Sequence, residues 1–547
     1  MMGQSTIPLP EHPRPDFNRS IWKNLNGMWD FRFDPNNIGL IEKWNLGETK
    51  FDKEIAVPFP WGSNLSGVKD DANIGWYSRS INVPSEWKTK KTFITIGACD
   101  WETTLWLDGN LIGKHCGGYV PFSFNLTPYL KYDSDQKLVI RVDDDAGDPS
   151  KFKRGHALYG KQGYGNARGI WQTVYLEARG KDYIEAVHFN PDIDNSKINV
   201  SAHIKNDSED ILPLSLKIKT DSGFITHNIQ IKPGEQKRNF DIEIPNMRLW
   251  SLDDPFLYGV EVSFGEDVIQ TYFGMRKIST KILPGTDYPY VALNNKPIYL
   301  QMALDQSYHP DGYYTFPNDN FIKEEILRSK SIGLNGIRIH IKTEVPRKLY
   351  WADKLGLLVV QDLPNSWGEP DKLMKDEIKY TLEEMIKRDY NHPSIFSWVI
   401  FNEQWGLYTT NDSDDSKQNE REILPETYDW VASMYYYAKS LDQSRLIEDN
   451  SPCCGGLHTV TDINSWHNYL PGYEWENYLK KEAEKNFKGG SHLYYRGFKQ
   501  DNQPFMNSEC GNVWGYKGST GDIDWSYDYH AMINSFRIFP EIAGWVY

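Results

Sequence analysis

The chain from about residue 280 onward alternates short apolar segments with amphipathic ones, and this alternation constrains the fold more than any other feature. In the segment 376–390 four apolar side chains fall on one face of a helix: Ile378, Leu382, Met385 and Ile386. Eight segments have the length and composition of strands: 297–305, 335–340, 357–362, 396–403, 445–449, 463–469, 504–509 and 543–547. Eight strands, mostly separated by helices, predict a (β/α)₈ TIM barrel over residues 280–547. A doubly wound open sheet is the alternative, and it would bind ligands where the strand order reverses.

The first 279 residues follow a different pattern, in which short strands succeed one another across Gly- and Asp-containing turns. Strands such as 91–97, 103–109, 137–144 and 173–179 predict a β-sandwich over residues 1–182. Residues 183–279 alternate more cleanly, and about seven strands fit there, which predicts an immunoglobulin-like sandwich. This stretch has no Cys, so the sandwich would lack the usual disulfide. We therefore expect three domains, 1–182, 183–279 and 280–547.

Composition and charge exclude several classes of partner. The net charge is −15, whereas phosphate backbones and anionic membrane surfaces are bound by positive patches, so we expect neither nucleic acid nor a membrane as a partner. The 77 aromatic residues (20 Trp, 33 Tyr and 24 Phe) favour carbohydrate, because aromatic rings pack against the apolar faces of sugars. The cysteines form no C-x-x-C pair and are odd in number, so no disulfide framework, metal site or other cofactor is expected: Cys99, Cys116, Cys453, Cys454 and Cys510.

The two ends of the chain raise separate expectations. The start lacks the basic region and apolar run of a signal peptide, and no segment of 18 apolar residues exists, which favours a cytoplasmic protein or one whose leader has been removed. The chain stops inside the eighth predicted strand, before the final helix that a barrel normally adds. We expect that the chain is shortened or that another segment closes the barrel. The sequence does not indicate the oligomeric state.

Polar or aromatic side chains accompany most of the predicted barrel strands near their carboxyl ends. Active sites of TIM barrels lie at these ends. A buried polar group is costly unless it meets a partner or a ligand. Seven of the eight strands carry such residues, which we take as candidate site residues: Asp305, Arg338, His340, Asp362, Asn402, Glu403, His467, Tyr469, Glu509 and Trp545.

Two of these candidates are glutamates on the fourth and seventh strands, which face each other across a ring of eight. Cleavage of a glycoside with retention needs two carboxyl groups about 5–5.5 Å apart, one as acid/base and one as nucleophile. Glu403 lies between Phe401 and Trp405, and these apolar neighbours predict a raised pKa that suits the acid. Glu509 is predicted to stay ionised through nearby hydrogen-bonding groups, drawn from Asn507, Ser508, Arg338 and Tyr469.

Longer motifs across nearly the whole chain resemble glycoside hydrolase family 2, the group of β-galactosidases, β-glucuronidases and β-mannosidases. Four of them resemble the jelly-roll domain of that family: WKNLNGMWDF (22–31), GWYSR (75–79), TLWLDGNLIGKHCGGYVPFSFNLT (104–127) and GIWQTVYLE (169–177). Four others resemble its catalytic barrel: GLNGIRIH (333–340), YWADKLGLLVVQDLP (350–364), RDYNHPSIFSWVIFNEQWG (388–406) and PFMNSECGN (504–512).

The resemblance implies a role for each matching residue. Glu403 matches the acid/base and Glu509 the nucleophile, and Asn402 matches the residue that hydrogen-bonds the sugar 2-hydroxyl. The remaining matches are expected to contact the sugar or the nucleophile: Arg338, His467, Tyr469 and Trp545. Asp305, His340 and Asp362 are looser matches, because the surrounding RIHIKTEVP and VVQDLP segments depart from the family pattern. His309 and Trp367 are further candidates. The Asn-x-Lys motif with which family glucuronidases bind the uronate lies beyond the eighth strand, so the sequence does not decide this specificity.

Three functions fit these observations. The favoured hypothesis is a retaining, exo-acting O-glycosidase with a carbohydrate substrate, where the resemblance favours a β-galactoside and leaves β-glucuronide, β-mannoside and α-L-arabinoside open. The second is a non-catalytic carbohydrate-binding protein, which would need no paired acid and nucleophile. The third is a metal-dependent barrel hydrolase with His340, Asp362 and His467 as ligands, although no two of them have ligand spacing on one element.

Overall fold

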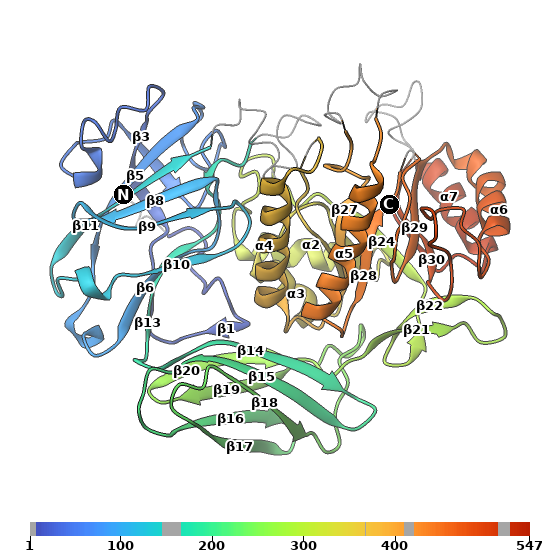
Figure 1. The fold of residues 1–547 in the computed structure, drawn as a ribbon, viewed down its shortest axis with the longest axis horizontal. Helices are drawn as coiled ribbons and strands as arrows, with labels where there is room; N and C mark the ends of the chain where they lie inside the picture. The colour runs from blue at the N-terminus through green and yellow to red at the C-terminus, as the bar shows by residue number, and fades with distance from the viewer. Residues whose placement is uncertain (1–6, 145–165, 367, 410–420, 454, 512–525) are drawn as a thin grey trace.

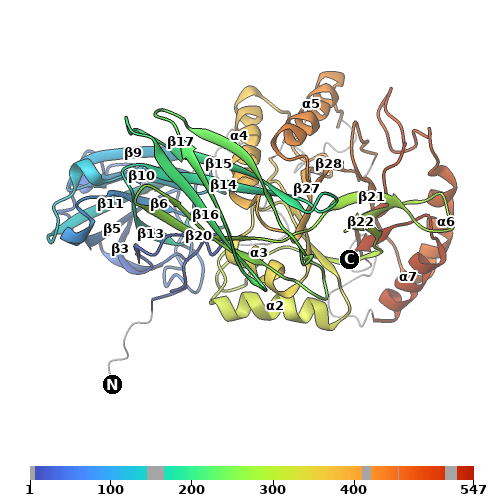
Figure 2. The ribbon, with the colours of Figure 1, turned by 90° about the horizontal axis from the view of Figure 1, so that it is seen from below.

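The computed structural model describes residues 7–144, 166–366, 368–409, 421–453, 455–511 and 526–547. Figure 1 shows the blue N-terminal strands on one side, a green sandwich below, and the yellow-to-red C-terminal half on the other side. Figure 2 looks from the side of the green sandwich, which lies across the junction of the other two parts.

The N-terminal part is built from two antiparallel sheets. One has the order β10-β6-β13-β2, with β2 (Trp22–Asn24), β6 (Lys91–Ile96), β10 (Phe122–Asn125) and β13 (Val174–Arg179). The other has the order β4-β3-β5-β11-β8-β9, with β3 (Gly27–Phe33), β4 (Lys53–Val57), β5 (Ile74–Asn82), β8 (Glu102–Leu107), β9 (Asn110–Cys116) and β11 (Asp135–Asp143). Their inward residues form one apolar core, which includes Trp29, Tyr77, Ile94 and Ile140. A short pair, β7 (Cys99–Asp100) with β12 (Gly169–Ile170), lies beside them.

The second sandwich also has two sheets. The smaller contains β14 (Tyr183–Asp192), β15 (Lys197–Lys205) and β18 (Lys237–Glu243). The larger contains β1 (Phe17–Asn18), β16 (Leu212–Thr220), β17 (Gly223–Ile231), β19 (Tyr258–Phe264) and β20 (Asp267–Phe273). Every second residue of β15 is buried, as the alternation in its sequence predicts. β1 comes from the start of the chain and pairs with β20, which ties the first residues to the second sandwich.

A ring of eight parallel strands forms the C-terminal half. They are β24 (Leu300–Asp305), β25 (Gly336–Ile339), β26 (Leu358–Asp362), β27 (Ile395–Asn402), β28 (Leu446–Ser451), β29 (Asn464–Tyr469), β30 (Phe505–Gly511) and β31 (Gly544–Val546). β24 pairs with both β25 and β31, so the first strand meets the last as in a barrel and unlike in an open doubly wound sheet. Backbone hydrogen bonds from His467 to Pro452 (3.0 Å) and from Ala543 to Phe505 (2.7 Å) join β29 and β30 to their neighbours. The predicted TIM barrel is confirmed.

Helices surround this ring: α2 (Asp319–Ser331), α3 (Pro346–Leu355), α4 (Lys372–Asp389), α5 (Pro425–Leu441), α6 (Trp475–Lys485) and α7 (Ser526–Ile538). Among the residues that the structure describes, none of the helices is long and apolar enough to cross a membrane. The helix predicted at 376–390 is α4, and all four side chains of its apolar face are buried. It begins at Lys372 because the Asp371 side chain caps it by accepting a hydrogen bond from the Met374 N–H (2.9 Å).

Shorter elements complete the connections. The 3₁₀ turns are η1 (Trp44–Leu46), η2 (Ser85–Trp87), η3 (Thr127–Tyr129) and η5 (Gly472–Glu474). Between the second sandwich and the barrel, the chain forms a small antiparallel sheet of β21 (Ile278–Ile282), β22 (Pro289–Leu293) and β23 (Lys296–Pro297). The first predicted barrel strand, 297–305, therefore begins three residues too early, because Lys296–Pro297 belongs to this sheet.

Candidate functional site

Arg338 organises the carboxyl end of the barrel. It lies on β25, is 1% exposed, and forms a bidentate ion pair with Asp362 at the end of β26 (2.8–3.1 Å). Its guanidinium also donates to Asn402 Oδ1 at the end of β27 (2.8 Å) and lies 3.2 Å from His467 Nε2 on β29. One planar cation on β25 thus fixes side chains from three other strands, which matches the fork geometry of an arginine.

The two glutamates meet at this network. His467 Nδ1 lies 2.8 Å from Glu403 Oε1 and 3.6 Å from Glu509 Oε2. These two oxygens are therefore no more than about 6.4 Å apart, the sum of the 2.8 and 3.6 Å legs. Tyr469 donates a short hydrogen bond to Glu509, and Arg338 lies 3.6 Å from the same carboxylate. The Glu403 side chain is 19% exposed, so this pair is open to solvent from its side.

The backbone at Glu403 adopts an unusual conformation. Glu403 and Gln404 both have positive φ, 50° and 61°, directly after the last residue of β27. Residues other than Gly and Asn rarely take this left-handed region, and such strain concentrates at functional sites. The turn directs Glu403 toward His467 instead of continuing the strand.

The two carboxyl groups titrate as a coupled pair, because both contact His467. Burial acts to raise the pKa of Glu403, but the hydrogen bond and charge of His467 outweigh it and lower this pKa to about 2. For Glu509, burial and the charge of Glu403 raise the pKa, and His467 and Arg338 oppose them only in part. In the free site the proton therefore favours Glu509. We predicted a raised pKa for Glu403 and an ionised Glu509, and this order of the two pKa values was wrong. The group that lowers the pKa of Glu403 is His467 on another strand, and the chain neighbours of Glu403 do not reveal that contact.

Several buried polar atoms around Glu509 have no hydrogen-bond partner within the described ranges: Glu509 Oε2, His340 Nε2 and Asn402 Nδ2. His340 is 2% exposed, and its Nε2 lies 3.8 Å from Glu509 Oε2. Burial and the charge of Arg338 lower the pKa of His340 to about 3, so its ring is neutral near pH 7. Unsatisfied buried groups cost about 1–3 kcal/mol each, so their convergence indicates a place for a polar ligand.

Two predicted site residues lie apart from this network. Trp545 packs in an apolar cluster with Trp466 and Phe536, between the strands and α6 and α7, while its neighbour Val546 joins a core shared by strands around the ring. Side chains alternate along a strand, so Trp545 points away from the ring interior. Asp305 forms an ion pair with the buried Lys348 (2.6 Å) and accepts from the Ser307 N–H (2.7 Å).

His309, a weaker candidate, is not part of the network either. The ring of His309 packs edge-on against Phe321 at 4.9 Å between centroids. Trp367 lies outside the described residues.

Sequence reasoning missed one member of the network. Ser451 receives a hydrogen bond from Arg338 (3.0 Å) and donates one to Asn402 (3.1 Å). It was missed because the fifth strand was predicted to end at residue 449, whereas β28 continues to Ser451. The sequence did contain a signal for the later strand end. Pro452 has no N–H to donate to a neighbouring strand, so it marks the end of the strand, and the polar residues directly before it were the candidates to consider.

The metal set His340, Asp362 and His467 is not brought together, because both oxygens of Asp362 bond to Arg338. Within the described ranges, the His, Cys, Asp and Glu side chains close enough to share an ion form a different group: Glu403, Cys453 and His467.

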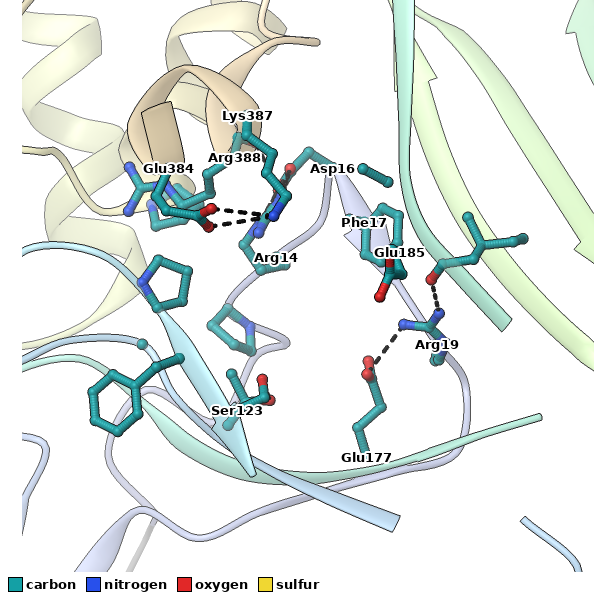
Figure 3. A pocket seen from close by; sticks show the side chains of 18 of the residues that line it. Arg14, Asp16, Phe17, Arg19, Ser123, Glu177, Glu185, Glu384, Lys387 and Arg388 are labelled. Atoms are coloured by element: carbon teal, nitrogen blue, oxygen red, sulfur yellow. Dashed lines mark hydrogen bonds and ion pairs between the residues drawn. The ribbon is translucent and has the colours of Figure 1, made fainter. Parts of the chain in front are cut away.

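A separate cavity of about 410 Å³ lies where the two sandwiches and the barrel meet (Figure 3). Most of its charged side chains are paired, among them Arg19 with Glu177 (3.1 Å) and Lys387 with Glu384 (3.2 Å). Arg338 and the two glutamates do not line it. We regard it as a polar domain junction, because most of its charged side chains already have partners.

Three sequence models of glycosyl hydrolases family 2 match consecutive parts of the chain: the sugar binding domain at 22–178, a second domain at 182–276, and the TIM barrel domain at 289–531. The chain belongs to glycosyl hydrolase family 2. The models follow one another in the order of the two sandwiches and the barrel, so the three-domain architecture is that of the family.

Individual family 2 relatives carry two different names. A β-galactosidase of Thermoanaerobacter pseudethanolicus is 24% identical over 78% of this chain, and a β-glucuronidase of Bacteroides fragilis is 23% identical over 81%. The matches span 53% and 63% of those relatives' own length. A solved β-glucuronidase of Ruminococcus gnavus in complex with D-glucuronic acid has a TM-score of 0.74 at 18% identity, covering 99% of this chain and 93% of that one. At this identity the likeness supports the shared fold.

Proposed function

We propose that this family 2 chain is a retaining, exo-acting O-glycosidase, with Glu403 as acid/base and Glu509 as nucleophile. The observation that carries the proposal is the shared contact of both carboxylates with His467. It keeps the two oxygens within about 6.4 Å, which is compatible with the roughly 5–5.5 Å between the carboxyl groups of retaining enzymes. Exo action is proposed from the family resemblance, in which the preceding domains wall off one end of the cleft.

In the first step, Glu509 attacks the anomeric carbon while Glu403 gives its proton to the leaving oxygen. This needs Glu403 protonated and Glu509 ionised, the reverse of the free site. Because His467 Nδ1 lies within 3.6 Å of Glu509, a small rotation of the imidazole toward Glu509 would raise the pKa of Glu403 and lower that of Glu509. In the second step the esterified Glu509 carries no charge, so the pKa of Glu403 falls and it accepts a proton from water; the water oxygen bonds to the anomeric carbon, and the bond from that carbon to Glu509 breaks and releases the carboxylate.

The surrounding groups support this chemistry. Burial and the nearby Glu509 raise the pKa of the Tyr469 phenol, which therefore stays a hydrogen-bond donor to the nucleophile. Arg338 offsets negative charge on Glu509 in the free enzyme. The unpaired Asn402 Nδ2 and His340 Nε2 are placed to bond with sugar hydroxyls.

Both a β-galactoside and a β-glucuronide are supported as substrates, because relatives with each name match a similar share of the chain. β-Mannosides and α-L-arabinosides are further candidates. Turnover of a panel of p-nitrophenyl β- and α-glycosides that includes these four sugars would identify the preferred substrate.

The same panel tests the reaction. We expect release of p-nitrophenol that survives EDTA and vanishes in Glu509→Gln. In Glu403→Ala, added azide should restore turnover as a β-glycosyl azide, because a small anion can attack the intermediate without a general base. Sugar binding without any turnover would instead support a non-catalytic carbohydrate-binding protein. Loss of turnover with EDTA would support a metal-dependent hydrolase.

A further inference from the structure

Three side chains of different chemistry converge beside the proposed acid/base. Glu403 follows β27, Cys453 follows β28, and His467 lies on β29, so they come from three neighbouring strands of the ring. A carboxylate oxygen, a thiol sulfur and an imidazole nitrogen all lie within 4.8 Å of one another. Cys453 carries a thiol, which hydrogen-bonds to Glu403.

We propose that Glu403, Cys453 and His467 form a reversible, inhibitory binding site for a thiophilic divalent cation such as Zn²⁺. Zinc binds sulfur at about 2.3 Å and nitrogen or oxygen at about 2.0–2.2 Å in a tetrahedron, which separates its ligand atoms by roughly 3.3–3.7 Å. Moving the three donor atoms from their present spacing to this one needs shifts of about 1 Å, within the reach of side-chain rotation. The fourth position would hold water.

The donor set selects the metal. Thiolate and imidazole ligands favour Zn²⁺ and similar cations, whereas Mg²⁺ and Ca²⁺ prefer sites made of oxygen atoms alone. The proposed site therefore predicts inhibition by Zn²⁺ and no comparable effect of Mg²⁺.

The charge around the site also favours a cation. Three carboxyl groups lie close together here, on Asp362, Glu403 and Glu509. Within the described residues, Arg338 is the one arginine or lysine within 4.0 Å of any of them, and it is shared between Asp362 and Glu509. A divalent cation would offset the remaining negative charge.

One contact limits the strength of binding. Arg338 Nη1 lies 3.2 Å from His467 Nε2, and this arrangement favours the tautomer with its proton on Nδ1. A cation bound through Nδ1 would also have to displace the hydrogen bond between His467 Nδ1 and Glu403 Oε1 (2.8 Å). Binding is therefore expected to be reversible and weaker than at a structural zinc site.

Direct binding is tested first, with Co²⁺ as a spectroscopic substitute for Zn²⁺. The native chain should show a thiolate-to-cobalt charge-transfer band in the near ultraviolet that Zn²⁺ displaces. Cys453→Ser should abolish the band, and the matched control Cys116→Ser should keep it, because Cys116 is an exposed cysteine on β9 of the first sandwich. No band in the native chain, or an equal band in Cys453→Ser, would overturn the proposal.

Inhibition is the second readout, and it rests on the proposed glycosidase function. Zn²⁺ should inhibit hydrolysis in competition with the substrate, and EDTA should reverse it, because the metal occupies the oxygen that donates the proton. In Cys453→Ser, the Zn²⁺ concentration for half inhibition should rise at least about tenfold, as the serine hydroxyl keeps the hydrogen bond but ligates zinc poorly. Equal inhibition of the two proteins counts against the site. If no glycoside is cleaved at all, the proposed function fails while the cobalt band still decides the metal site.

Discussion

Two buried arginines, Arg445 and Arg338, lie at opposite ends of the barrel strands, and the side chains bonded to them differ in how completely their polar atoms are paired. At the amino end, Arg445 bonds to Asp442 (2.7 Å) and to the backbone carbonyls of Ile395, Tyr390 and His392. Asp442 also receives the Trp398 indole N–H (2.9 Å). At the carboxyl end, Arg338 is also buried, but Glu509 Oε2, His340 Nε2 and Asn402 Nδ2 have no hydrogen-bond partner in the described chain, and Glu509 Oε2 has only ion pairs of 3.6–3.8 Å.

The comparison separates stability from function. Removing one partner of a buried, fully hydrogen-bonded ion pair is strongly destabilising, so we assign the Asp442–Arg445 network to the integrity of the fold. The Arg338 network leaves costly atoms without partners, and a fold tolerates such a cost where a ligand will meet them. The pKa shifts agree: burial raises the pKa of Asp442, but Arg445 and the hydrogen bonds outweigh it and lower the value to about 2, whereas the pKa of Glu509 is raised.

The largest contrast is expected between Glu509→Gln and Asp442→Asn. At pH 7 an ionised Glu509 is disfavoured in the folded state, because its folded pKa lies above the usual value, so a neutral isostere should keep stability or add about 1 kcal/mol. Its turnover should fall about 10⁴-fold or more. Asp442→Asn breaks a complete buried pair and should cost about 3 kcal/mol, with turnover of the folded fraction little changed.

Chemical denaturation and p-nitrophenyl glycoside turnover measure both effects. The comparison fails if Glu509→Gln unfolds as easily as Asp442→Asn, because the two networks would then contribute alike to the fold.

The sequence predicts the barrel better than its site, because the apolar repeat of a strand or a helix is visible among residues that lie close together in the chain. The apolar runs located all eight strands. Ser451, the member of the Arg338 network that we missed, was overlooked because we predicted that the fifth strand ends at residue 449, two residues before its actual end. Whether a strand side chain faces the interior of the ring or the helices outside it is harder to predict from neighbouring residues. Trp545 was assigned to the site, yet the alternation along the short β31 turns it toward α7.

Protonation depends least on local sequence. Phe401 and Trp405 predict a raised pKa for Glu403, but a histidine 64 positions later in the chain lowers it. Electrostatic contacts across the ring come from residues far apart in sequence, so neighbours in the chain do not reveal them.

Two substitutions on β27, one in each network, should have effects on stability and activity that are smaller than those of Glu509→Gln and Asp442→Asn. Trp398→Phe leaves Asp442 without one donor and should cost about 1–2 kcal/mol of stability, with kcat and KM unchanged. Asn402→Ala removes the oxygen that accepts from Arg338 and Ser451, so it should cost about 1–3 kcal/mol of stability, but unlike Trp398→Phe it should also lower kcat/KM about 10²-fold. Thermal unfolding and steady-state kinetics on both variants supply the measurement. A loss of activity in Trp398→Phe larger than in Asn402→Ala would reverse the assignment of the two ends.

The smallest effect concerns acid pH and His340. Burial and then Arg338 lower its folded pKa to about 3, below the unfolded value of 6.5, so the unfolded state binds a proton first as the pH falls. Stability should therefore decline below pH 6.5, by about 1 kcal/mol at pH 5.5. Asp442 affects stability only at lower pH, because the stabilisation from its negative charge is lost as the pH falls from 3.8 toward its folded pKa of about 2. In His340→Gln the decline between pH 7 and 5.5 should be smaller, as measured by thermal unfolding at both pH values. An unchanged decline in this variant would show that groups outside the unpaired carboxyl end govern the acid response.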